Sequence, residues 1–284
     1  MRCRFCVFLI FVASLLRVQA ATNIPVEFPF EYREGLLWIE VNLAQSDKPL
    51  HFLLDTGAGT SVMNLSTAKH LGLTPGQLVT VRGVDATLPG YWEGPLTVKA
   101  GVVELPDKYL AVDLGKLSGS CGQTVDGLIG ADFFCKHVVQ IDFEAQKVRL
   151  LNLEKAAKTD EVMPLQLRQC GMRVPITVNG HKRQWVRLDT GCAGALQWVT
   201  SDVNSNECTR QTAIGLTEVS ILEAKTDVMI GEQKFQGVPT GLHENAIFPG
   251  EAGLLGNGLL SRFSAVTIDA KAGRVILKQH LPVP

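Results

Sequence analysis

The chain has 284 residues, of which 46% are hydrophobic and 19% are charged. This composition is that of one large globular domain or two small ones, and it excludes a disordered or fibrous chain. The net charge is only −1, so charge gives no reason to expect nucleic acid as a partner.

The N-terminus has the pattern of an export signal. Arg2 and Arg4 precede an apolar run at 5–16 and a small-residue cleavage site before Ala21. The alternative is a retained membrane anchor, but the run is shorter than the about 20 residues that a spanning helix needs. We therefore expect residues 1–20 to be a cleaved signal peptide. The mature protein would be periplasmic or secreted, with no membrane association.

The expected secondary structure after this segment is mostly β. Short runs rich in β-branched and apolar residues are bounded by Gly, Pro or Asp, which is typical of strands. In chain order, the expected strands lie at 36–43, 51–54, 94–100, 138–143 and 148–151. Brief helices are expected at 66–71, with Ser66 as N-cap, and at 131–137, with Asp132 in the first turn. The fold class is therefore all-β.

The sequence repeats its own landmarks in the same order. Asp-Thr-Gly occurs at 55–57 and again at 189–191, and Gly-Leu-Ile-Gly at 127–130 is matched by Gly-Leu-Leu-Gly at 253–256. The matched positions are 134 and 126 residues apart, so only small insertions separate the two copies. The copies also share Val139–Asp142 with Val266–Asp269, and Val148–Leu150 with Val275–Leu277.

A polar, charge-rich segment lies between the two copies, as expected of a solvated connection. We place the domain boundary there. The predicted organisation is a signal peptide at 1–20, an N-terminal lobe at 21–153, a linker at 154–162 and a C-terminal lobe at 163–284. Each lobe carries one Asp-Thr-Gly loop.

The Asp-Thr-Gly loops are the strongest candidates for chemistry. A strand that ends in a tight turn presents a carboxylate at a fixed position, and glycine allows a close approach that a side chain would forbid. One such tripeptide is a weak signal, because Asp and Gly are ordinary turn residues. Two of them, each within the same larger pattern, are a strong one.

The segments at 52–62 and 126–130 carry a resemblance to a known family. They resemble the active-site loop and the second signature of the aspartic proteases of the retropepsin and pepsin kind, and the similarity extends from about residue 31 to residue 277. It implies an all-β fold of two similar lobes around a cleft, with Asp55 and Asp189 as the catalytic pair. It further implies a peptide or protein substrate, no cofactor, no metal and a monomer.

The resemblance also implies supporting roles around the two aspartates. A threonine and a glycine follow each of them, and a further glycine lies beneath each loop. The threonines would lock the loops together through backbone hydrogen bonds, and the glycines would shape the loops or let a strand pass below. These residues are Thr56, Thr190, Gly57, Gly191, Gly130 and Gly256.

A hairpin flap over the substrate is the family's means of excluding water. By the resemblance, it carries a glycine roughly 25 residues after the catalytic aspartate, a length compatible with a strand, a helix and a hairpin. Gly83 in the first copy and Gly215 in the second lie in suitable places. A flap from each lobe would be the retropepsin arrangement.

The mechanism implied by the resemblance depends on a shared proton. Two carboxyls about 3 Å apart cannot both ionise. The ionised member would act as general base on a water, and the protonated member would polarise the peptide carbonyl. Neither a metal nor a covalent intermediate is required.

The second loop departs from the family pattern. It has no hydroxyl residue to match Thr60 and Ser61, which would bond the outer carboxylate oxygens. Loss of donors to a carboxylate raises its pKa, so we expect activity at weakly rather than strongly acidic pH. The alternative function is a peptide- or ligand-binding protein that keeps the fold without turnover.

The remaining candidates receive structural roles. Asp126 and Asp132 are expected to act only in a turn and a helix start. Five cysteines follow the signal, so at least one is free or bonded to another molecule in an oxidising compartment. The candidate disulfides are Cys121 with Cys135 and Cys192 with Cys208, but the sequence leaves the connectivity of all five cysteines, including Cys170, open. No cysteine spacing matches a zinc site. We expect a structural role for Cys192.

Overall fold

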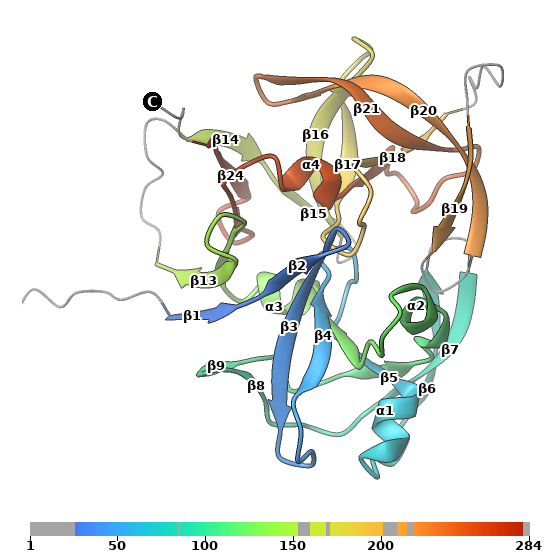
Figure 1. Ribbon diagram of the computed structural model, residues 1–284, viewed down its shortest axis with the longest axis vertical. Coiled ribbons are helices and arrows are strands. Elements are labelled where there is room, and N and C mark those ends of the chain that lie inside the picture. Colours follow the sequence, from blue (N-terminus) through green and yellow to red (C-terminus); the bar gives the residue numbers. More distant parts are fainter. Residues whose placement is uncertain are drawn as a thin grey trace, which may run out of the picture.

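The computed structural model describes residues 26–83, 86–152, 160–168, 171–200, 209–214 and 218–280 (Figure 1). Within these ranges the chain consists of β-strands arranged in three sheets, with four short helices. The fold is therefore all-β, as the sequence predicts. None of the helices in this part of the chain is long and apolar enough to cross a membrane.

The first sheet is built from the first half of the chain. Its strand order is β6-β7-β10-β5-β11-β4-β3-β8-β9, and β2 pairs with β3. The bounds are β2 (Glu31–Arg33), β3 (Leu36–Leu43), β4 (Leu50–Leu54), β5 (Val62–Asn64), β6 (Leu78–Gly83), β7 (Ala86–Trp92), β8 (Val98–Ala100), β9 (Val103–Glu104), β10 (Leu110–Val112) and β11 (Gly127–Ile129).

The second sheet is built from the second half. Its order is β15-β16-β17-β22-β18-β21-β20-β19. The bounds are β15 (Gln166–Arg168), β16 (Gly171–Val178), β17 (Gln184–Leu188), β18 (Leu196–Val199), β19 (Thr209–Ile214), β20 (Glu218–Ile230), β21 (Gln233–His243) and β22 (Gly253–Leu255).

The two sheets repeat one strand order, which is the structural form of the sequence repeat. The order β6-β7-β10-β5-β11-β4-β3 corresponds strand by strand to β19-β20-β21-β18-β22-β17-β16. The directions agree as well: β11 runs parallel to β4 and antiparallel to β5, and β22 runs parallel to β17 and antiparallel to β18. The matched landmarks therefore occupy matched strands.

A third sheet joins the two halves. Its order is β1-β13-β12-β23-β24-β14. At its centre, β12 pairs antiparallel with β23, so the repeated motif Val139–Asp142 lies beside its own copy, with Val139 opposite Ile268 and Ile141 opposite Val266. The bounds are β1 (Val26–Pro29), β12 (Val138–Asp142), β13 (Lys147–Leu151), β14 (Glu161–Pro164), β23 (Ala265–Asp269) and β24 (Arg274–Lys278).

The helices are short and differ in detail from the expectation. They are α1 (Leu65–His70), α2 (Gly115–Ser120), α3 (Ala131–Phe134) and α4 (Asn257–Leu260). The N-cap of α1 is Asn64 and not Ser66, because the Asn64 side chain accepts the Ser66 amide at 3.2 Å. Helix α3 ends at Phe134, earlier than expected, because the Lys136 amide donates to the Phe133 carbonyl, three residues before it, and the α-helical hydrogen-bond pattern stops there.

The predicted strands at 36–43, 51–54, 138–143 and 148–151 are confirmed to within one residue at each end. Only 98–100 of the expected strand at 94–100 is extended and paired. Most of the expected linker, at 154–159, lies outside the described residues. Its last two residues begin β14, which pairs with β24.

The apolar core runs through all three sheets. The inner strands β11, β16 and β23 are buried along almost their whole length, so both of their faces lie in the core, whereas the edge strand β6 alternates between exposed and half-buried residues. Phe52 and Phe263, one from each half, are fully buried members of the same main cluster. A smaller cluster, which includes Leu36, Leu114 and Leu128, lies in the first half. Its side chains also face the site described next.

Candidate active site

Each Asp-Thr-Gly loop starts where a central strand ends. Asp55 follows β4 and its amide donates to the Ile129 carbonyl at 2.9 Å. Asp189 follows β17 and its amide donates to the Leu255 carbonyl, also at 2.9 Å. Each aspartate is thus held by the strand of the Gly-Leu-Ile-Gly or Gly-Leu-Leu-Gly motif of its own half. The same local sequence gives the same local geometry twice.

The glycines that end these motifs allow a close approach of the loops. A Cβ at Gly130 would lie 2.4 Å from the Thr60 carbonyl oxygen. A Cβ at Gly256 would lie 2.3 Å from the Gly194 carbonyl oxygen. Both distances are far inside van der Waals contact, so neither position has room for a side chain.

The two threonines bind the loops to each other. The Thr56 hydroxyl donates to the Leu188 carbonyl at 2.7 Å, and the Thr190 hydroxyl donates to the Leu54 carbonyl at 2.8 Å. Each hydroxyl also accepts the backbone amide of the other threonine at 3.0 Å. Both side chains are fully buried or nearly so, so the four hydrogen bonds are shielded from water.

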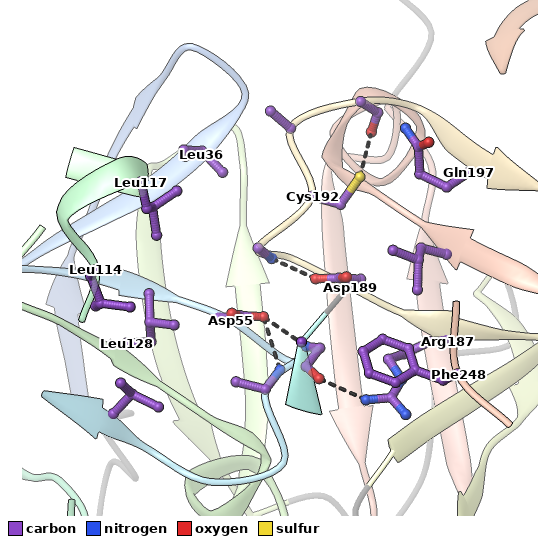
Figure 2. A pocket seen from close by; sticks show the side chains of 18 of the residues that line it. Leu36, Asp55, Leu114, Leu117, Leu128, Arg187, Asp189, Cys192, Gln197 and Phe248 are labelled. Carbon is purple, nitrogen blue, oxygen red and sulfur yellow. Dashed lines mark hydrogen bonds between the residues drawn. The ribbon is translucent and has the colours of Figure 1, made fainter. Parts of the chain in front are cut away.

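This contact brings the two carboxyl groups to face each other (Figure 2). A Cβ at Gly57 would lie 2.4 Å from Cγ of Asp189, and a Cβ at Gly191 would lie 2.5 Å from Cγ of Asp55. The glycine of each loop therefore packs against the carboxyl of the other loop. The structure thus brings Asp55, Asp189, Thr56, Thr190, Gly57, Gly191, Gly130 and Gly256 together.

The two carboxylates have unequal donor sets. Oδ1 of Asp55 accepts the amides of Gly57 at 2.9 Å and Ala58 at 3.0 Å. Oδ1 of Asp189 accepts the Gly191 amide at 2.9 Å, while the Cys192 amide donates to the Asp189 backbone carbonyl. Asp55 therefore has one more amide donor for its charge than Asp189 has.

Burial dominates the electrostatics of the pair. Removal from water raises the pKa of Asp55, and amide donors oppose part of this rise. Removal from water, and then the charge of Asp55, raise the pKa of Asp189 well above its ordinary value. Two carboxyls in this arrangement share one proton over a range of pH, and the donor sets favour Asp189 as its holder.

The expected role of the first-loop hydroxyls is wrong. Thr60 and Ser61 do not bond the Asp55 carboxylate: their hydroxyls donate to the Asp132 carboxylate at 3.3 and 2.8 Å. Asp132 also accepts the Ser61 amide at 3.1 Å. The asymmetry between the catalytic candidates instead comes from the Ala58 amide.

Asp132 and Asp126 therefore do more than start a helix or close a turn. Asp132 holds the far end of the first loop. Asp126 accepts the His51 amide at 2.9 Å and the Thr67 hydroxyl at 2.7 Å, so it ties β4 to α1. The second copy has Gly258 at the position of Asp132, so a comparison of the two copies gives no sign that Asp132 holds the first loop.

A cavity of about 950 Å³ opens beside the two carboxyls. One wall is apolar and comes from the first half (Figure 2). The opposite wall comes from the second half and carries several polar groups. The apolar wall includes Leu36, Val81, Leu110, Leu114, Leu117 and Leu128, and the other includes Gln197, Ile221, Glu223, His243 and Phe248.

The hairpin of β6 and β7 borders this cavity. Gly83 pairs with Ala86 near its tip, and Val81, Arg82 and Gly83 line the cavity. Gly215 lies outside the described residues. The strands that flank it, β19 and β20, form the corresponding hairpin of the second half, and β19 lies beside α2 of the first half (Figure 1).

The thiols near the cavity are not bridged. Cys121 and Cys192 are free, so neither candidate disulfide is formed. Cys170 and Cys208 lie outside the described residues. Burial, and then the Asp189 charge, raise the pKa of Cys192 to about 12, so this thiol stays neutral and is a poor nucleophile. In the described ranges, no group of three or more His, Cys, Asp or Glu side chains is placed to hold a metal ion.

Three contributors to the site were missed in the sequence. Asn257 donates from Nδ2 to the carbonyls of Gly35 and Thr190, each at 2.7 Å, and so joins the β2–β3 hairpin to the second loop. Arg187 and Glu251 form a buried ion pair beside the dyad. The one available signal was within the repeat, where Arg187 replaces the apolar Leu53.

A comparison with known families gives a match in the first half of the chain. Residues 39–133 match a family model described as Aspartyl protease. The match includes the first loop, the β6–β7 hairpin and the Gly-Leu-Ile-Gly motif, about a third of the chain. No curated protein matches the chain. The match supports an aspartyl protease family, and with it a hydrolase that acts on peptide bonds.

Proposed function

We propose that this protein is an aspartic endopeptidase in which Asp55 and Asp189 together activate a water molecule. The observation that carries the proposal is the reciprocal packing of each loop glycine against the opposite carboxyl. Two carboxyls that share a proton provide a general base and a general acid in one site. The match to the aspartyl protease family supports the same chemistry.

The catalytic cycle follows from the two protonation states. The ionised Asp55 would take a proton from the water as it attacks the peptide carbonyl. The protonated Asp189 would donate a hydrogen bond to the carbonyl oxygen, where negative charge develops. When the tetrahedral intermediate collapses, a proton passes to the leaving amine and the shared-proton state is restored.

The cavity supports a peptide substrate with a large apolar side chain on one side of the cleaved bond. Leucine and valine side chains form the wall next to Asp55, and burial of an apolar side chain there contributes about 1.5–3 kcal/mol. In this proposal the β6–β7 hairpin, with Gly83, covers the substrate, and the β19–β20 hairpin covers it from the other half. The flap role of Gly215 stays a prediction from the sequence. The protein would work after export, in the periplasm or outside the cell, as a two-lobed monomer.

The decisive experiment combines peptide cleavage with two conservative variants. The purified protein is incubated with a peptide mixture between about pH 3 and pH 7, the range of carboxyl titration. Asp55→Asn and Asp189→Asn should each lower turnover by about 10²–10⁴-fold, because each removes a proton-transfer group. Asp47→Asn, at an exposed position, should retain full turnover.

A binding function is the second candidate, favoured by the poorer donor set of Asp189. It predicts that the wild-type protein retains peptides without releasing products. Cleavage that persists in both Asn variants would refute a dyad mechanism. Retention of peptides without any cleavage would favour the binding function.

A further inference from the structure

Arg187 is a buried cation two residues before Asp189. It lies in β17 with 7% of its surface exposed, and it lines the same cavity as the two aspartates. The corresponding residue of the first copy is Leu53, which is buried in the apolar cluster. A buried charge is costly unless it is paired and hydrogen bonded, so its surroundings indicate what it does.

One segment of the second half holds the guanidinium from two sides. Nε and Nη2 of Arg187 donate to the two carboxylate oxygens of Glu251 at 2.7 and 2.9 Å. The Phe248 ring covers the guanidinium, with its centroid 3.6 Å from Cζ (Figure 2). A Cβ at Gly171 would lie 2.8 Å from Nη2 and 2.9 Å from Glu251 Oε1, so the neighbouring strand leaves room for this pair.

The remaining edge of the guanidinium reaches the other half. Nη1 of Arg187 donates to the Gly57 carbonyl at 2.8 Å. Gly57 is the residue that packs against the Asp189 carboxyl. Arg187 therefore connects the start of the second loop to the glycine of the first, at the point where the two loops meet. The planar fork makes this possible, because it offers donors in fixed directions.

The charge of Arg187 acts on both aspartates. Burial raises the pKa of Asp189 and the pKa of Asp55, and the positive charge of Arg187 lowers both, so it opposes part of the rise. Titratable side chains from other elements line the same cavity. These are Glu34 in the β2–β3 hairpin, Arg82 in β6, Cys121 after α2, Cys192 in the second loop, Glu223 in β20 and His243 in β21.

We propose that Arg187, fixed by Glu251 and Phe248, is a positioning residue that holds Gly57 against the second loop and sets the pH range in which the Asp55–Asp189 pair carries one negative charge. As a statement about catalysis this rests on the proposed peptidase function. As a statement about the titration of the pair it does not depend on turnover.

The test measures the titration of the carboxyls directly. The full-length protein is labelled with ¹³C at the aspartate carboxyls, and the resonances of Asp55 and Asp189 are assigned with the Asn variants. The double variant Arg187→Met/Glu251→Gln removes both charges without leaving either partner unpaired. An opposite charge nearby lowers a carboxyl pKa by about 1–3 units, and the simultaneous loss of the Glu251 charge, which does not line the cavity, cancels part of this effect. We therefore expect the titration of the pair to move upward by about half a pH unit.

Two further variants separate charge from shape. Arg187→Lys keeps the charge but loses the fork, so the titration should remain within about 0.3 pH unit while peptide turnover falls. Glu251→Gln leaves the Arg187 charge uncompensated and should move the titration downward. Arg149→Met is the control: Arg149 forms partly buried ion pairs with Glu27 and Asp142, and none of these three residues lines the cavity. It should lower thermal stability without moving the titration.

The outcomes distinguish the two proposals. An unchanged titration in the folded double variant would overturn the role of Arg187, whether or not the wild type cleaves peptides. A titration that moves as expected in a protein that never cleaves peptides would support the role of Arg187 and refute the peptidase function. Thermal unfolding of each variant shows which ones are folded. If Arg187→Lys or Glu251→Gln is unfolded, the titration of the double variant alone decides the role of Arg187.

Discussion

Replacement of Thr56 by valine tests the contact between the two Asp-Thr-Gly loops, because valine has nearly the same shape and no hydroxyl. The change removes the hydrogen bond to the Leu188 carbonyl and the one from the Thr190 amide. Both partners are buried in the loop contact. Each buried group left unsatisfied costs about 1–3 kcal/mol, so Thr56→Val should lower the free energy of unfolding by about 2–6 kcal/mol.

Thr56→Ser is the matched control. It keeps the hydroxyl and removes one buried methyl group, which is worth about 0.8 kcal/mol. Urea unfolding of the wild type and both variants gives the free energies by linear extrapolation. Peptide cleavage measured on the same samples should fall strongly for valine and little for serine, since the loops would no longer hold the carboxyls in place.

The comparison between valine and serine can refute the reasoning. If Thr56→Val and Thr56→Ser destabilise the protein equally, the hydroxyl contributes nothing and the loops are held by packing alone. If Thr56→Val loses stability but cleaves peptides at the wild-type rate, the contact does not position the catalytic pair.

Three further predictions concern the carboxyl pair. Gly191→Ala should abolish turnover, because the new Cβ would lie 2.5 Å from Cγ of Asp55. Gly119→Ala is the control and should leave turnover unchanged, because nothing lies within 4 Å of its Cβ. Equal turnover in the two variants would contradict the packing of Gly191 against the Asp55 carboxyl. Since burial raises the pKa of Asp55 and Asp189, the pH profile of cleavage should have its maximum above about pH 4, the ordinary aspartate range, and a maximum near about pH 2 would be inconsistent with it. The raised pKa of Asp189 also means that its stabilising contribution is complete below the unfolded pKa and is lost as pH rises through the folded pKa. Asp189→Asn should remove this loss, so the urea concentration at the unfolding midpoint should rise in the variant, relative to the wild type, between about pH 4 and pH 7. If the midpoints of the two proteins change with pH in parallel, the pKa of Asp189 is not raised.

The repeated landmarks made much of this site predictable. Asp55 and Asp189 could be paired because each follows an apolar strand and precedes the same later motif. The strands β4 and β17 occupy corresponding positions in the two sheets and share the same sequence punctuation, so they end in the same turn and the positions of Thr56 and Thr190 followed. The strand at 36–43 was predictable for a different reason, since its composition and bounding residues are those of a buried strand.

The remaining features depend on contacts that sequence order hides. Glu251 pairs with Arg187 from 64 residues away, and no local pattern links them. Asp132 looks like an ordinary first-turn acid because its partners, Thr60 and Ser61, lie about 70 residues earlier. The helix cap went to Asn64 rather than Ser66 by a shift of two positions, which is within the usual uncertainty of helix boundaries.

The sheet that joins the halves restricts how the cavity can open. β12 and β23 pair in register over four residue pairs at its centre. A hinge between the halves would break these bonds, at a net cost of about 0.5–1.5 kcal/mol each. The base of the molecule should therefore stay rigid during a binding cycle. A long peptide would then enter and leave by movement of the β6–β7 and β19–β20 hairpins. The rate at which these hairpins move would therefore limit the rate of turnover.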